Sequence, residues 1–254
     1  MIFDTHSHYD DEAFDKDREA LLESLPQNGI SHIVNIGASI ETTKNTIELT
    51  NKYDFIYGAA GVHPSETAEL NEENFAWLRE VLKLPKIVAV GEIGLDYFWD
   101  TPDRQIQRIW FERQMELAKE VGKPMVIHSR DAAKETFDMI VAAGGKDIGG
   151  VIHCYSSSLE MAKEYVKLGF YIGIGGVLTF KNAKKLKEVV EYLPIEYIVL
   201  ETDCPYLSPE PNRGKRNSSL NLSYVVETIA QIKGMHYEEV AQKTNQNAKA
   251  LYRL

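Results

Sequence analysis

Short apolar runs alternate with longer amphipathic stretches along nearly the whole chain. The runs are rich in Val and Ile, which favours strands, whereas the stretches between them carry apolar residues at helical spacing. Eight strands are predicted in this way, at residues 2–6, 32–37, 55–62, 87–92, 124–128, 149–153, 170–174 and 197–201.

Helices are predicted between and after these strands. Proline and glycine mark several helix ends: Pro102 lies near the start of the longest stretch and Gly122 directly follows it, as both residues prefer. The predicted helices cover residues 16–27, 41–52, 72–84, 102–121, 132–143, 159–168, 182–192, 222–233 and 237–252.

The regular alternation predicts an α/β fold. Strands separated by helices form parallel sheets with right-handed crossovers. Eight such units in 254 residues favour a closed (β/α)8 TIM barrel over an open sheet. The polar loop at residues 205–217 leaves too little chain behind it for another domain. We therefore expect residues 1–254 to form one barrel domain.

The composition narrows the class of protein. A formal net charge of −10 argues against binding nucleic acid through bulk positive charge, although a local basic patch or bound metal ions would still attract phosphate. The two cysteines are far apart and allow no disulfide framework. The chain shows neither a basic and apolar leader nor an apolar run of about 20 residues. We therefore expect a cytoplasmic protein without membrane contact, monomeric or weakly oligomeric.

Histidines and carboxylates follow the predicted strands. His6 and His8 are two residues apart at the end of the first strand, so both imidazoles face one side of the sheet. The carboxyl ends of parallel strands meet at one rim of a barrel, where active sites of this fold lie. The residues expected at that rim are His6, His8, His63, Glu92, His128, His153 and Asp203.

This set of side chains is typical of a divalent metal site. Imidazole and carboxylate ligands without thiolate suit Zn, Mn, Ni or Fe and, less typically, Mg. Without His63 the set still holds six candidate ligands, too many for one tetrahedral ion that keeps an open position. Two ions roughly 3.5–4 Å apart with a carboxylate between them are therefore favoured.

The same residues lie in motifs that resemble the TatD family of metal-dependent deoxyribonucleases. Each motif alone is a weak signal, but the ordered set is specific and runs from Asp4 to the C-terminus. The segment 218–222, SSLNL, departs from the family's proline-containing pattern, so fine substrate preference is not carried over. The motifs are DTHSH at 4–8, GVHP at 61–64, GEIGLDY at 91–97, HSRDA at 128–132, HCYS at 153–156, ETDCPYL at 201–207 and RGKRN at 213–217.

The resemblance implies that the barrel over residues 1–254 is of the metal-dependent hydrolase type. It also implies a divalent-metal-dependent hydrolase, most commonly a deoxyribonuclease with 3′→5′ exonuclease activity. The reaction would cleave phosphodiesters of single-stranded DNA with a water molecule activated by two metal ions. The expected cofactors are therefore two divalent ions of Mg, Mn or Zn. One ion would be held by His6, His8 and Glu92, and the other by Glu92, His128 and His153.

Three residues are predicted to act in the reaction. Glu92 would bridge the two ions. Asp203 would complete the metal site, orient the attacking hydroxide and accept its proton. His63 lies at the same rim and could hydrogen-bond the phosphate, although a structural role for this histidine is nearly as well supported.

DNA is the expected partner, as single strands or 3′ ends. Arg213, Lys215 and Arg216 flank a glycine in the loop after the last strand, where barrels of this kind commonly bind phosphate. Arg130 could grip the DNA backbone with them. Tyr97 follows a predicted metal-binding strand, and a base could stack on its ring. These residues are the predicted substrate contacts.

Two other functions remain open on the sequence. The same metal site would serve a hydrolase of amides, lactones or aminoacyl esters, but the basic loop at residues 213–216 favours a phosphate substrate. A non-catalytic scaffold stabilised by metal would unfold when the metal is removed, whereas a catalytic barrel would stay folded.

Overall fold

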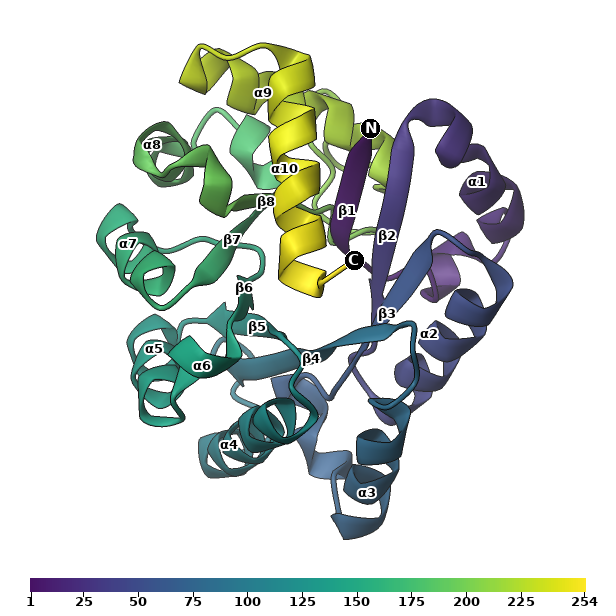
Figure 1. The fold of residues 1–254 in the computed structure, drawn as a ribbon, viewed down its shortest axis with the longest axis vertical. Coiled ribbons are helices and arrows are strands. Elements are labelled where there is room, and N and C mark those ends of the chain that lie inside the picture. Colours follow the sequence, from purple (N-terminus) through teal and green to yellow (C-terminus); the bar gives the residue numbers. More distant parts are fainter.

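A computed structural model describes residues 1–254 and contains the predicted (β/α)8 barrel. Eight parallel strands follow one another in sequence order around the sheet (Figure 1). The strands are β1 (Ile2–Ser7), β2 (Ile30–Ile36), β3 (Ile56–Ala60), β4 (Ile87–Asp96), β5 (Met125–Arg130), β6 (Gly150–Ile152), β7 (Phe170–Ile174) and β8 (Ile198–Leu200).

Backbone hydrogen bonds join the last strand to the first. The carbonyl of His6 accepts from the amides of Thr202 and Asp203, at 3.3 and 3.0 Å. The amide of His8 donates to the carbonyl of Cys204 at 2.9 Å. Because these contacts lie just beyond the end of β8, they hold the loop that carries Asp203 directly beside β1.

The buried carboxylate of Asp4 strengthens the same junction. It accepts hydrogen bonds from the amide and the hydroxyl of Thr202, at 3.1 and 2.7 Å, and from the hydroxyl of Ser219 at 2.6 Å. Burial raises the pKa of Asp4 to about 6, and the hydrogen bonds partly offset the cost of its charge. The first residue of the DTHSH motif therefore holds the loop after β8 in place.

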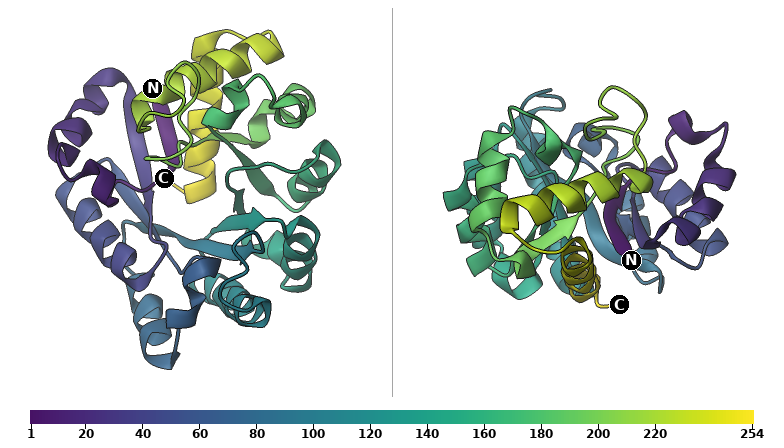
Figure 2. Two further views of the ribbon diagram at one scale, coloured as in Figure 1. Left: turned by 180° about the vertical axis from the view of Figure 1, so that it is seen from behind. Right: turned by 90° about the horizontal axis from the view of Figure 1, so that it is seen from above.

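Helices form the outer layer of the barrel (Figure 2). None of them is both long and apolar enough to span a bilayer. Helix α6 was not predicted, because one turn is too short to show a periodic pattern. The helices are α1 (Arg18–Ser24), α2 (Ile40–Lys52), α3 (Glu72–Val81), α4 (Arg104–Val121), α5 (Ala133–Ala142), α6 (Gly145–Ile148), α7 (Leu159–Lys167), α8 (Lys184–Tyr192), α9 (Leu222–Lys233) and α10 (Tyr237–Tyr252).

Helix α10 closes the N-terminal end of the barrel. Figure 1 shows it lying across the barrel near β1 and β8, and the side view in Figure 2 places it opposite the loop that follows β8. Its Ala248, Leu251 and Tyr252 pack with Phe3 in the apolar cluster that fills the barrel interior. The Tyr252 hydroxyl donates to the carbonyl of Thr5 at 2.8 Å. The carboxyl ends of the strands are thus left as the open face.

The layer between strands and helices supplies most of the apolar core. Phe111 of α4 is fully buried in this layer. We expect Phe111→Ala to lower the free energy of unfolding by about 3–5 kcal/mol, because the truncation removes buried apolar surface and leaves a cavity. Denaturant unfolding of the purified variant measures this loss. Ile109→Ala on the exposed side of the same helix is the matched control, and an equal loss in both variants would contradict the prediction.

Candidate metal centre

The open face of the barrel gathers the predicted metal ligands from strands far apart in the sequence. His6 lies in β1, Glu92 in β4 and His128 in β5. His8 and His153 directly follow β1 and β6, and Asp203 lies in the loop after β8. Glu92 and His128 lie inside their strands rather than at the predicted ends, because β4 and β5 continue to Asp96 and Arg130.

The first group of donors lies around His6 and His8. Their Nε2 atoms are only 3.1 Å apart. Oδ1 of Asp203 lies 3.6 and 3.4 Å from these two nitrogens, and Oε2 of Glu92 lies 3.4 and 3.9 Å from them. Two imidazole nitrogens facing two carboxylate oxygens form a donor set that suits a divalent cation.

The second group of donors lies around the other oxygen of Glu92. Its Oε1 is 2.9 Å from Nδ1 of His128 and 2.8 Å from Nε2 of His153. Nε2 of His63 lies 3.8 Å from the same oxygen. Glu92 therefore presents one carboxylate oxygen to each group of histidines.

Both carboxylates of this centre are ionised at neutral pH. Burial alone would raise the pKa of Glu92, but the attraction of His153 and His63 and hydrogen bonds from His128 and His153 hold it well below its ordinary value. Burial also acts against the charge of Asp203, whose pKa is nevertheless held below its ordinary range by a hydrogen bond from His8. The centre therefore holds two negatively charged carboxylates among its imidazole rings.

His63 is placed to act as a hydrogen-bond donor. Burial lowers its pKa to about 4, and the neighbouring His128 acts in the same direction, so the ring is neutral at pH 7. The amide of Ser65 donates to Nδ1 of His63 at 3.1 Å. The ring proton therefore lies on Nε2, the atom that faces the second group of donors.

Two ligand histidines are oriented by groups behind them. Nδ1 of His8 lies 3.1 Å from the carbonyl oxygen of Ile36, and Nε2 of His128 lies 3.0 Å from Oδ2 of Asp96. Such contacts fix the orientation of a metal-binding imidazole. Asp96 was not among the predicted site residues, although it lies in the GEIGLDY motif at an even spacing from Glu92, which is the signal for a shared strand face.

A cavity of about 920 Å³ opens above these groups. Arg130 and Trp99 line it from the ends of β5 and β4, and Arg130 is the only Lys or Arg among its lining residues. The guanidinium of Arg130 stacks on Phe98 at 3.7 Å from the ring centre. The loop after β1 and helix α2 contribute acidic side chains instead, namely Asp10, Asp11, Glu12 and Glu41.

The other predicted substrate contacts do not line this cavity. The Tyr97 hydroxyl donates to Glu135 at 2.8 Å, and Arg104 covers the Tyr97 ring. Arg213 stacks on Phe180. Arg216 forms paired hydrogen bonds with Asp17 at 2.6 Å, and Lys215 lies exposed between these two arginines.

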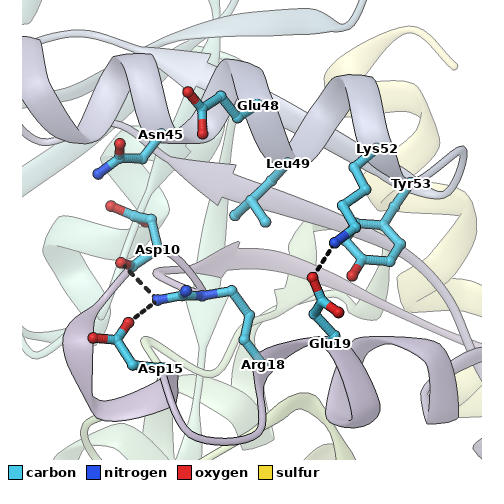
Figure 3. Close-up of a pocket in the computed structure, with 9 residues that line it drawn as sticks. All are labelled: Asp10, Asp15, Arg18, Glu19, Asn45, Glu48, Leu49, Lys52 and Tyr53. Atoms are coloured by element: carbon cyan, nitrogen blue, oxygen red, sulfur yellow. Dashed lines mark hydrogen bonds and ion pairs between the residues drawn. The ribbon is translucent and has the colours of Figure 1, made fainter.

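A second cavity, of about 450 Å³, lies beside helices α1 and α2 (Figure 3). Both of its basic side chains are paired, Arg18 with Asp15 and Lys52 with Glu19, and the acidic Asp10 and Glu48 also line it. No histidine lines it. The histidine-rich cavity at the open face is therefore the candidate active site.

Comparisons with known proteins identify relatives that match along the whole chain. The family model described as TatD related DNase matches residues 3–253. The metal-dependent hydrolase YabD of Bacillus subtilis is 44% identical over the whole of both chains, and YcfH of Escherichia coli, also a metal-dependent hydrolase, is 32% identical over 100% of this chain and 96% of its own.

Solved structures show the same likeness. The crystal structure of YjjV, a TatD homologue of Escherichia coli, superposes with a TM-score of 0.94 at 30% identity and covers 100% of this chain and 98% of that one. An organophosphorus hydrolase of Deinococcus radiodurans, with a TM-score of 0.63, 15% identity and coverage of 99% and 92%, shares the fold alone. The chain therefore belongs to the TatD family and is a metal-dependent hydrolase.

Proposed function

We propose that this hydrolase is a two-metal deoxyribonuclease that shortens single-stranded DNA from its 3′ end. The observation that carries the proposal is the position of Glu92, which offers one oxygen to each of two histidine groups. Two divalent cations held by these groups would activate a water molecule and neutralise the phosphate and the leaving oxygen. The 3′→5′ polarity is inferred from the family resemblance.

Asp203 and His63 have complementary roles in this proposal. The Asp203 side chain is 20% exposed and faces the cavity, so its ionised carboxylate can orient the attacking water and take up its proton. His63 can donate its Nε2 proton to a phosphate oxygen, because Ser65 occupies its other ring nitrogen. Proton acceptance and charge stabilisation thus come from separate side chains.

The charges that line the cavity favour the binding of a DNA strand whose end lies at the metal centre. Arg130 attracts the phosphodiester backbone, and bases can stack on Trp99, which is 64% exposed. Asp11 and Glu12 in the loop after β1 and Glu41 of α2 also line the cavity. Their negative charges would repel a backbone that continued past the site. This arrangement supports exonuclease rather than endonuclease action.

Digestion of a 5′-labelled single-stranded oligonucleotide tests the proposed function. The assay compares Mg, Mn, Zn and EDTA, with Glu92→Ala and Asp203→Asn as inactive controls and circular single-stranded DNA as a substrate without ends. We expect metal-dependent stepwise shortening of the linear strand only. Absence of cleavage by protein that binds metal would overturn the nuclease and favour an amide, lactone or aminoacyl-ester hydrolase.

Trp99 provides a test of the substrate contacts. We expect Trp99→Ala to raise KM for single-stranded DNA roughly 5- to 150-fold, since stacking of one base contributes about 1–3 kcal/mol. The value of kcat should change little, because Trp99 is not among the groups that face the two histidine clusters. Tyr192→Ala, which removes an exposed aromatic ring of α8, is the control. An unchanged KM in Trp99→Ala would exclude stacking on this ring.

A further inference from the structure

Three buried polar atoms without hydrogen-bond partners lie behind the metal centre. They are Nδ1 of His6, Nδ1 of His153 and Oε2 of Glu201. One ring nitrogen of each histidine and one carboxylate oxygen of Glu201 lie within 4.8 Å of one another, and all three residues are buried. Buried polar groups are nearly always paired, so three unpaired atoms in one place require an explanation.

The two histidines belong to different donor groups of the metal centre. His6 directs its Nε2 towards the first group and His153 directs its Nε2 towards the second. Their rings stack with centres 3.9 Å apart and planes 11° from parallel. A neutral imidazole that binds metal through Nε2 carries its proton on Nδ1. Each ring therefore has a buried N–H donor that needs an acceptor.

Glu201 is the acceptor placed to serve both donors. Its Oε1 lies 3.7 Å from Nδ1 of His153 and also accepts a hydrogen bond from the backbone amide of Cys154. A carboxylate has about four acceptor positions, so two histidine N–H groups and one amide can share it.

The carboxylate of Glu201 fits against β7 because residue 173 is a glycine. A Cβ atom on Gly173 of β7 would lie 2.3 Å from Oε2 of Glu201, which is closer than real contacts allow. Any larger residue at Gly173 would push the carboxylate away from its position. The absence of a side chain there is thus explained by the presence of Glu201.

We propose that Glu201 is a positioning residue that accepts hydrogen bonds from His6 and His153 when metal is bound, and so links one ligand from each donor group. The inference rests on the two-ion centre of the proposed function. Asp96 differs from Glu201 in this respect, because its side chain hydrogen-bonds only one of the ligand histidines, His128. Glu201 would then affect the affinity for both metal ions, whereas Asp96 would affect the affinity for only one of them.

Metal affinities of Glu201→Gln test the proposal. Competition of the purified protein with a chromophoric chelator for Zn²⁺ and Mn²⁺ measures both binding events. We expect both to weaken about 10- to 100-fold, the usual effect of losing a hydrogen-bond partner of a metal ligand. Glutamine keeps the shape but exchanges an acceptor oxygen for an NH₂ donor. Asp96→Asn is the matched control and should weaken one event only.

Three further measurements keep the test decisive. Thermal unfolding of metal-free Glu201→Gln checks that the variant folds, and Gly173→Ala should reproduce the loss of both affinities with Glu201 unchanged. In zinc-loaded wild-type protein, nitrogen-15 NMR should detect exchange-protected Nδ1 protons on both His6 and His153. This last readout needs no variant and does not depend on activity.

The possible outcomes distinguish the role of Glu201 from the proposed nuclease activity. Wild-type affinities in Glu201→Gln, or a loss confined to one binding event, would overturn the role of Glu201 while leaving the nuclease untouched. Loss of both affinities in Glu201→Gln, together with a metal-loaded wild-type protein that fails to cut DNA, would support the role of Glu201 and overturn the nuclease. A wild-type protein that binds a single ion would overturn the two-ion centre and the link through Glu201 together.

Discussion

Glu92→Gln should reduce the rate of DNA shortening about 1,000-fold and remove at least one metal ion from the protein. The amide keeps the shape of the side chain but carries no charge, and it can offer an oxygen to only one of the two histidine groups. Metal ions contribute several kcal/mol of charge stabilisation to such reactions, and about 4 kcal/mol corresponds to a factor of about 1,000 in rate. Single-turnover digestion and metal analysis of the same sample measure both effects.

The control for this variant is Glu120→Gln. Glu120 pairs with Arg79 at 2.8 Å on the outer helices, so its neutralisation changes the net charge by the same amount without touching the centre. The Glu120→Gln variant should retain the wild-type rate of DNA shortening and the wild-type metal content. A Glu92→Gln variant that still holds two ions would show that Glu92 does not bridge them.

Asp203→Asn should lower kcat by about 100- to 10,000-fold, the usual contribution of a positioned general base, with a smaller effect on metal content than Glu92→Gln. The asparagine oxygen can still face His6 and His8, but the amide cannot take up a proton. The backbone should tolerate the change, because Asp203 has a φ of 54° and asparagine is among the residues that adopt this conformation most readily.

Steady-state kinetics and metal analysis together test the role of Asp203. We expect kcat to fall while KM for DNA stays within a few-fold of wild type, since the substrate contacts on Arg130 and Trp99 are unchanged. Near wild-type kcat with full metal content would mean that another group accepts the proton. Loss of kcat together with both ions would mean that Asp203 acts only as a ligand.

Local patterns in the amino-acid sequence are enough to predict the barrel and the set of residues at its open face. Strand and helix patterns are local, so the alternation of β-branched runs with amphipathic stretches could be followed without knowing any long-range contact. The rule that parallel strands expose their carboxyl ends on one rim then brought His6, Glu92 and His153 together, although they are far apart in the chain. The family followed from the order of the motifs and is confirmed by the comparisons.

Which atoms come into contact, and which predicted substrate contacts lie outside the cavity, depends on the three-dimensional fold. The division of the oxygens of Glu92 between two groups, and the places of Asp96 and Glu201 behind the histidines, depend on side-chain directions that no local pattern encodes. Arg216 lies against Asp17 rather than in the cavity, because an arginine pairs with the nearest carboxylate in space. That neighbour is 199 residues away in the sequence, and only the closed barrel brings it near.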